Sequence, residues 1–227
     1  MHVDHAHGQD GYLKALGGLL DAFGQLDDRA VLAASGCFGW NVGDVLTHVH
    51  LGLQEMLLAL GMYTDDAPDA DAASYWRAFP PNHGVISDDQ LDDIQFVRRA
   101  NAAYRRPADV LRHFAITANG LLDRVPTLPE VAMPFQGKVL TSGDFLAIWI
   151  VEIVIHHLDL QAEVTLPDPH PTALRLTRQV IEALVGEELP HGVPDRTVVL
   201  IGAGREPVGD VHSRAVGKLA ARLPVLG

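Results

Sequence analysis

Hydrophobic and polar positions follow helical spacing along most of the chain, which predicts a mainly α fold. The predicted helices cover residues 12–29, 41–62, 88–104, 108–125, 144–163, 172–187 and 210–223. Residues 196–201 (RTVVLI) form a short β-branched run that predicts a strand. Prolines at 167, 169 and 171 mark a boundary. We therefore expect a four-helix bundle over residues 1–166 and a small C-terminal α/β appendage over residues 167–227 that docks on it.

The predicted helix at residues 144–163 differs from the others because it is apolar on almost every side. Three polar residues, Glu152, His156 and Asp159, nevertheless fall within one narrow sector of it, at offsets of four and three residues. A buried carboxylate or imidazole must be paired or bound to a metal, because burying it alone costs several kcal/mol. Glu and His one turn apart suit two adjacent ligands of a divalent ion, and they equally suit a hydrogen bond inside a core.

The helix at residues 41–62 carries two histidines that compete for an inward position. Asn41 is its predicted N-cap, and Thr141 or Ser142 is the predicted N-cap of the helix at residues 144–163. His50 borders the apolar stripe, whereas His48 lies about 120° from the centre of the stripe. Periodicity alone therefore favours His50 as the inward residue. His2, His5 and His7 precede the first predicted helix, and we expect them to lie on a solvated tail.

Composition limits the functional classes that need to be considered. The chain has 227 residues, of which 48% are hydrophobic and 20% charged, as in globular proteins. Its formal net charge is −12, which argues against nucleic acid or an anionic membrane as a partner. The single cysteine, Cys37, excludes an internal disulfide. No signal peptide or membrane span is evident, so we expect a cytoplasmic protein.

Two motifs about a hundred residues apart resemble those of a known family. The first is Trp40-x3-Asp44-x3-His48, and the second is Glu152-x3-His156-x2-Asp159. Together they are similar to the mycothiol-dependent maleylpyruvate isomerases, within the DinB-like metal-binding four-helix bundles. The resemblance covers roughly residues 12–163. It implies a divalent metal, most commonly Zn²⁺, held by His48, Glu152 and His156, and it favours His48 over His50.

The resemblance also implies a reaction. A metal with two histidines and one carboxylate keeps an open position, where a coordinated thiol would be deprotonated. That thiol would belong to mycothiol or another low-molecular-weight thiol, and it would attack a small electrophilic substrate in an isomerisation or S-transfer. Asp159 would orient a ligand histidine, or alternatively form a charge pair at the helix end. We expect Arg205 to anchor an anionic substrate, with Arg98 and Arg99 as alternatives, and Cys37 to be a small packing residue.

Two other functions remain open at the level of sequence. A metal-dependent hydrolase would use the same three ligands with water in place of the thiol. A non-catalytic helical protein would hold Glu152, His156 and Asp159 as a polar network in its core. The expected partners are small molecules, and the chain could be a monomer or a homodimer.

Overall fold

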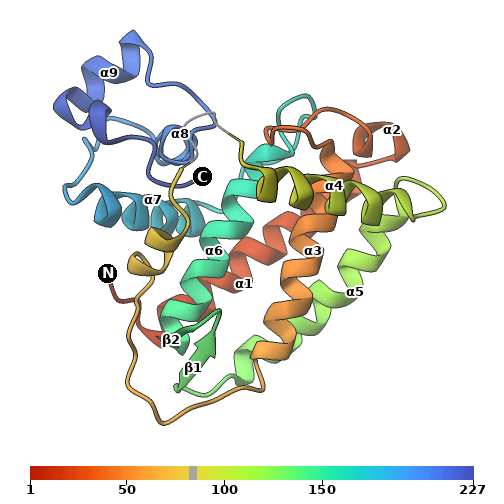
Figure 1. Cartoon of the computed structure of the whole chain (residues 1–227), viewed down its shortest axis with the longest axis horizontal. Helices are drawn as coiled ribbons and strands as arrows, with labels where there is room; N and C mark the ends of the chain where they lie inside the picture. The colour runs from red at the N-terminus through yellow and green to blue at the C-terminus, as the bar shows by residue number, and fades with distance from the viewer. Residues whose placement is uncertain (82–85) are drawn as a thin grey trace.

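The fold is mainly helical, as the sequence predicts, and carries one small β-hairpin (Figure 1). It was analysed in a computed structural model that describes residues 1–81 and 86–227. The elements within these residues are α1 (His5–Ala22), α2 (Asp28–Val31), α3 (Val42–Ala59), α4 (Asp88–Ala102), α5 (Asp109–Arg124), β1 (Ala132–Phe135), β2 (Lys138–Thr141), α6 (Ser142–Asp159), α7 (Pro171–Val185), α8 (Asp195–Gly202) and α9 (Asp210–Val216), with short 3₁₀ turns between some of them.

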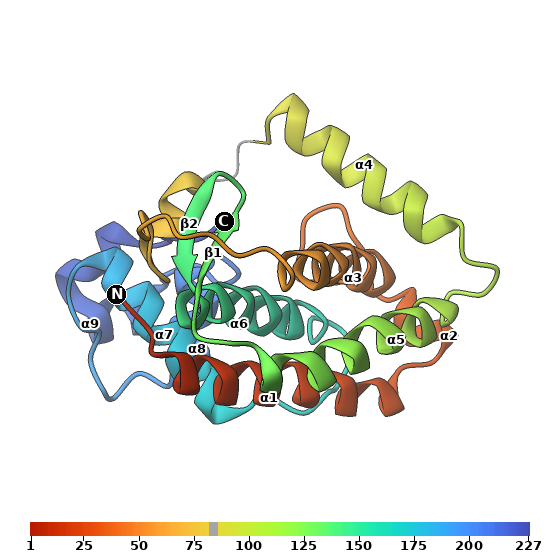
Figure 2. The same ribbon diagram turned by 90° about the horizontal axis from the view of Figure 1, so that it is seen from below.

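Four long helices, α1, α3, α5 and α6, form the bundle. α6 packs against α1 and α3, and α5 packs against α1 and α3 on the other side, so each helix has two bundle neighbours. α7 covers another side of α6, while α4 lies on the outside of α3 (Figure 2). Every residue of α6 is buried except Glu152. The prediction of a helix enclosed on most faces is thus confirmed, and the one residue that is not buried carries a carboxylate.

Local sequence sets the start of the two helices that matter most. Asn41 caps α3: its side chain accepts a hydrogen bond from the Asp44 amide, and the Asp44 carboxylate accepts one from the Asn41 amide. Such a reciprocal box satisfies backbone donors that the helix itself leaves free. Thr141 caps α6 through its hydroxyl, which accepts from the Asp144 amide and donates to the Asp144 carboxylate. Both caps were predicted, the second as a choice between Thr141 and Ser142.

The expected solvated tail at the N-terminus is wrong. α1 begins at His5, capped by Asp4, and the residues before it lie against the start of α6. The buried Asp144 carboxylate accepts hydrogen bonds from the Val3 amide and from His2 Nδ1. Two glycines, Gly8 and Gly143, allow this approach: a Cβ on Gly143 would lie 2.2 Å from the Val3 carbonyl oxygen. At its other end α1 stops at Ala22, earlier than predicted.

The connection before α6 contains a hairpin that the sequence analysis missed. β1 and β2 pair antiparallel, with Met133 opposite Leu140 and Phe135 opposite Lys138. Gln136 and Gly137 form the turn with φ values of 46° and 75°. Positive φ at both turn residues is the geometry that two-residue hairpins favour. Pro134 made a strand improbable on sequence grounds, and it is accommodated because this sheet has only two strands within the described residues.

The predicted α/β character of the C-terminal appendage is also wrong. Residues 196–201 lie within helix α8, and α7 and α9 are helices as expected. In α8 Val198, Val199 and Ile201 are fully buried, and the helix packs on α7 and α6. A short continuous apolar run does not distinguish a strand from a buried helical segment, so packing decides between them. No helix in the described residues combines the length and apolar character needed to cross a bilayer.

Candidate metal centre

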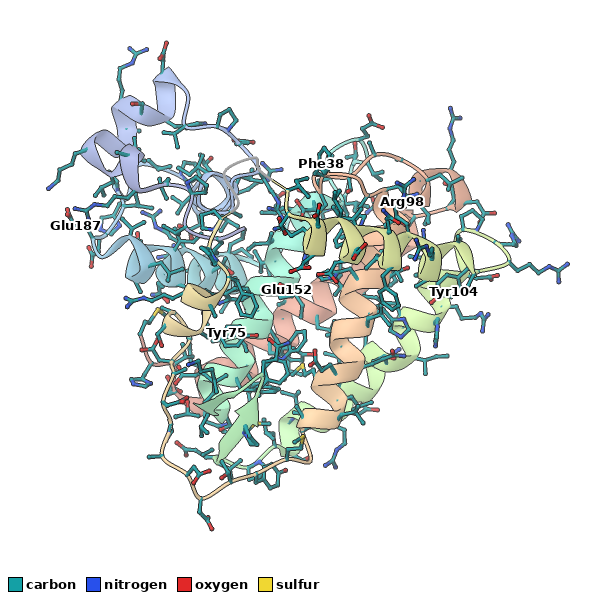
Figure 3. The ribbon with its side chains drawn as sticks, in the orientation of Figure 1. Phe38, Tyr75, Arg98, Tyr104, Glu152 and Glu187 are labelled. Atoms are coloured by element: carbon teal, nitrogen blue, oxygen red, sulfur yellow. The ribbon has the colours of Figure 1, made fainter. Side chains whose placement is uncertain are left out.

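Glu152, the one open position of α6 (Figure 3), contacts His48 of α3. His48 Nε2 is 3.0 Å from Glu152 Oε1, and His156 Nε2 is 3.2 Å from the same oxygen. These potential ligand atoms all lie within 4.8 Å of one another. The structure therefore brings together the three residues that the resemblance implied as ligands.

The two histidines of α3 occupy different environments. His50 points inward, as periodicity predicted, but it enters the interface with α5, where its Nε2 is 3.0 Å from the Thr117 hydroxyl. Burial and the nearby His113 lower the pKa of His50 to about 4. His48 keeps 36% of its side chain exposed and is the α3 histidine that contacts Glu152. The inward residue and the site residue are thus different histidines.

Trp40 supports the ring of His48. The two rings lie 4.9 Å apart between centroids, and the Trp40 indole N–H donates to the Ile94 carbonyl of α4 at 3.4 Å. Asp44, the middle residue of the same motif, has a structural role, because it closes the cap of α3 and accepts a hydrogen bond from Asn101. The motif thus fixes the start of α3 and the orientation of His48 together.

Asp159 contacts the other nitrogen of His156. Its Oδ2 lies 2.9 Å from His156 Nδ1, which leaves Nε2 directed at Glu152. A carboxylate behind a ligand histidine fixes the ring and raises its basicity. The predicted contact between Asp159 and a ligand histidine is present.

Arg205 reaches the site, but its guanidinium is bound to Asp159. Arg205 Nε is 2.9 Å from Asp159 Oδ1, and Nη2 is 3.2 Å from Oδ2. The Arg205 side chain is 21% exposed. A substrate anion would have to compete with Asp159 for it, so its expected role as an anchor stays a prediction. Of the alternatives, Arg98 and Arg99 lie exposed on α4, and Arg99 bonds Gln95 there.

Cys37 is a site residue that the sequence analysis assigned to packing. Its thiol is 3.0 Å from Asp159 Oδ2 and 3.7 Å from His156 Nδ1. The loop before α3 approaches closely enough because Gly36 has no side chain: its amide donates to the Asp159 carbonyl at 2.8 Å, and a Cβ would lie 2.5 Å from Asp159 Oδ1. No local pattern links Cys37 to residues more than a hundred positions away, so sequence spacing gave no signal.

Charges in the cluster compensate one another. Burial alone would raise the pKa of Glu152, but His156 and His48 outweigh it and hold that pKa well below its usual range. Burial would lower the pKa of His156, yet Glu152 and Asp159 hold it well above its usual range. The pKa of Asp159 is lowered despite burial, by His156 and Arg205. In the protein alone, a proton on His156 thus serves as the cation between two carboxylates.

This donor set fits a divalent metal. Two imidazoles and one carboxylate are ligands that Zn²⁺ takes in catalytic sites, and the imidazole Nδ1 of His156 already has a carboxylate partner. A bound cation would take the place of the extra proton that His156 now carries between the Glu152 and Asp159 carboxylates. His157, next in sequence, faces elsewhere: it is 1% exposed, and burial lowers its pKa to about 4.

Comparison with known proteins identifies a family for most of the chain. The sequence model of one family, described as the mycothiol maleylpyruvate isomerase N-terminal domain, matches residues 13–161. The matched residues contain His48, Glu152, His156 and Asp159, whereas Arg205 lies beyond them. The comparisons found no matching curated protein and no matching solved structure.

Proposed function

Because the chain belongs to the mycothiol maleylpyruvate isomerase N-terminal domain family, with its DinB-like helical fold, we propose that it is a metal-dependent enzyme that uses a low-molecular-weight thiol. The metal is held by His48, Glu152 and His156, a donor set that suits Zn²⁺. Mycothiol or a related thiol is the cofactor, and a small electrophile is the substrate. Isomerisation and S-transfer are the two reactions that fit this description. A reducing cytoplasm, expected from the single cysteine, would keep such a thiol reduced.

One observation supports this proposal most strongly: the only unburied residue of α6 is the carboxylate that two histidines face. A polar network that serves the core alone would be enclosed. Here Glu152 is 24% exposed and His48 is 36% exposed, while His156 is only 9% exposed on its side chain. The ligand atoms therefore border solvent, where a thiol and a substrate would enter.

The residues of the chain prepare the site before any ligand arrives. A divalent cation, when bound, supplies Lewis acidity that lowers the pKa of a coordinated thiol or water. Glu152 contributes one negative charge, so a 2+ ion keeps net positive charge for an anionic sulfur. Asp159 would keep the Nδ1 proton of His156 in a hydrogen bond when a cation displaces the Nε2 proton, so that the Nε2 lone pair would face the cation. Trp40 limits rotation of the His48 ring.

Arg205 remains our candidate for binding the substrate anion. Its guanidinium lies at the edge of the cluster and is partly exposed. A carboxylate on the substrate would draw one of its N–H groups away from Asp159 while Nη1 keeps its bond to the Ala203 carbonyl. The C-terminal region would then contribute to substrate binding although it lies outside the family match.

Metal content tests the first part of the proposal. We expect about one zinc per chain by elemental analysis in the wild type. In a Cys37→Ser background, which removes the thiol beside His156 and Asp159 as a competing ligand, His48→Ala and Glu152→Gln should lower this content strongly, whereas His50→Gln should keep it because His50 faces α5. Absence of stoichiometric metal in zinc-treated wild type would contradict the proposal and favour a non-catalytic helical protein.

Thiol dependence tests the second part. Zinc-loaded protein would be assayed with a panel of small unsaturated carboxylic acids, with and without mycothiol, for isomerised products and S-conjugates. We expect turnover only when the thiol is present, and none for Glu152→Gln. Turnover of hydrolysable substrates without any thiol would instead identify a metal-dependent hydrolase on the same ligands.

A further inference from the structure

His156 belongs to two separate sets of potential metal ligands. Its Nε2 faces Glu152 and completes the set described above. Its Nδ1 faces Asp159 Oδ2 at 2.9 Å and the Cys37 thiol at 3.7 Å. Cys37, His156 and Asp159 again present three ligand atoms within 4.8 Å of one another. The proposed function makes no use of this second group as a binding site.

The spacing of the second group fits a tetrahedral ion. Metal–ligand bonds of about 2.0–2.3 Å place neighbouring ligand atoms of such an ion roughly 3.3–3.8 Å apart. The distances are 3.7 Å from Cys37 Sγ to His156 Nδ1, 3.0 Å from Sγ to Asp159 Oδ2, and 2.9 Å from Nδ1 to Oδ2. The two short distances are hydrogen bonds, which would lengthen slightly when a cation replaces the protons.

Arg205 contacts this group and would have to give up part of that contact to a metal. Its Nη2 is 3.2 Å from Asp159 Oδ2 and 3.7 Å from Cys37 Sγ, whereas Nε holds Oδ1 at 2.9 Å and Nη1 holds the Ala203 carbonyl. A metal at Oδ2 and Sγ would displace the two Nη2 contacts, while the Nε and Nη1 hydrogen bonds keep the guanidinium on Oδ1. With a thiolate, a carboxylate and one guanidinium, the group carries a net charge of about −1, the same as the His48, Glu152 and His156 set.

We propose that Cys37, His156 and Asp159 form a second, thiolate-containing site for a soft divalent cation, which competes with the first site for the same histidine. A neutral imidazole has one lone-pair nitrogen and one N–H. When Nε2 binds a metal, Nδ1–H donates to Asp159. When Nδ1 binds a metal, Nε2–H donates to Glu152. Occupation of one site by a metal therefore excludes the other, and the chain holds one ion in either of two positions.

The two positions differ in access. The first includes His48 and Glu152, which are partly exposed. The second is more buried, with Asp159 1% and His156 7% exposed and Cys37 half-buried. Binding at the second site breaks the S–H bond of Cys37, forms a sulfur–metal bond and releases the proton to solvent. A cation held there would be less accessible to an incoming thiol than one beside His48 and Glu152, so the second site stores the metal in a less reactive position.

Cobalt spectroscopy tests this proposal. Co²⁺ takes tetrahedral zinc sites, and a thiolate ligand adds an intense near-ultraviolet charge-transfer band. Because the chain has one cysteine, such a band identifies Cys37 directly. The experiment uses the full-length His48→Ala variant, in which the first site lacks a ligand, with a phosphine reductant and no other thiol. We expect one Co²⁺ per chain with the thiolate band.

The matched control is His48→Ala combined with Cys37→Ser, which should lose the band and bind Co²⁺ more than about 100-fold more weakly. Circular dichroism verifies that both variants are folded, and His48 is exposed enough for its truncation to be tolerated. A His48→Ala protein that binds no Co²⁺, or binds it without the band, overturns the proposal. The second site shares His156 with the proposed function. The experiment measures only Co²⁺ binding, so its result does not depend on whether the wild type shows thiol-dependent activity.

Discussion

Asp159 is the most highly connected side chain of the site. Its carboxylate accepts hydrogen bonds from His156, Cys37 and both Nε and Nη2 of Arg205. Asp159→Asn keeps the shape but removes the charge that supports His156 as a ligand. We expect zinc affinity to fall about 10- to 100-fold, as measured by competition with a chromophoric chelator. Asp123→Asn, at an exposed position of α5, is the matched control and should leave the affinity unchanged.

His50 makes the fold sensitive to acid. The folded protein holds its pKa at about 4, below the ordinary value of 6.5, so the unfolded chain binds more protons between these values. The contribution of neutral His50 to stability is therefore fully present above pH 6.5 and is lost as the pH falls towards 4. His50→Gln has no titrating group at this position. Between pH 7 and 4 the wild type should therefore lose up to ~3 kcal/mol of unfolding free energy relative to the variant.

Urea unfolding at a series of pH values measures that difference. Comparing two proteins removes the opposite contribution of His156, whose raised pKa stabilises the fold at lower pH. His7→Gln changes an exposed histidine and should give a curve parallel to that of the wild type. Parallel curves for His50→Gln as well would show that His50 is not held neutral by the fold.

Single residues of the site were predictable to different degrees. Glu152 and His156 followed from helical spacing on an apolar helix, because both ligands lie on one element. His48 followed only from the family resemblance, since periodicity favoured His50, which is indeed inward but faces Thr117. Cys37 and the partner of Arg205 were not predictable. The contacts of Cys37 join segments 119 to 168 residues apart, and Arg205 is 46 residues from Asp159, so no local pattern encodes these contacts.

Among the elements, the loop that carries Gly36 controls the shape of the site. A Cβ at Gly36 would lie 2.5 Å from Asp159 Oδ1 and 3.2 Å from the Asp159 Cα, so the loop or the end of α6 must shift. We expect Gly36→Ala to destabilise the protein by ~1–3 kcal/mol and to weaken zinc binding as well. Thermal unfolding and chelator competition measure the two effects.

Gly24→Ala is the control for that substitution. A Cβ at Gly24 meets nothing within 4 Å, so the variant should be as stable as the wild type or slightly more stable. If Gly36→Ala behaved like Gly24→Ala in both measurements, the close approach of the loop to α6 would be contradicted.

Elements were predicted best where their ends carry chemical signals. The caps at Asn41 and Thr141 placed the starts of α3 and α6 correctly. The sequence analysis took α8 for a strand because of its β-branched residues. Packing against α7 and α6 buries these residues in a helix, and such a tertiary effect is not contained in residue propensities. The hairpin of β1 and β2 was missed because Pro134 and the surrounding prolines resembled an irregular connection.

At the scale of the whole molecule, the C-terminal helices share the core of the bundle. α7 packs on α6 and α1, and the buried apolar residues of the bundle and of α7 and α8 form one continuous cluster. The predicted boundary after residue 166 thus separates segments that stabilise each other. We expect calorimetry to show a single transition with equal calorimetric and van't Hoff enthalpies. Two resolved transitions would establish residues 1–166 and 167–227 as independent units.

The pairing of α1 with α6 has a consequence for biosynthesis. These two helices make the most extensive contact between elements in the described residues, yet 120 residues separate Ala22 from Ser142. At ~5–20 residues per second, the apolar face of α1 waits about 6–24 s on the ribosome for its partner. Tyr12, Leu16 and Leu19, all buried in the finished fold, stay uncovered during that interval. Because its core depends on a contact between such distant segments, the protein completes its fold late in translation. Until α6 emerges, the apolar face of α1 is available to chaperones.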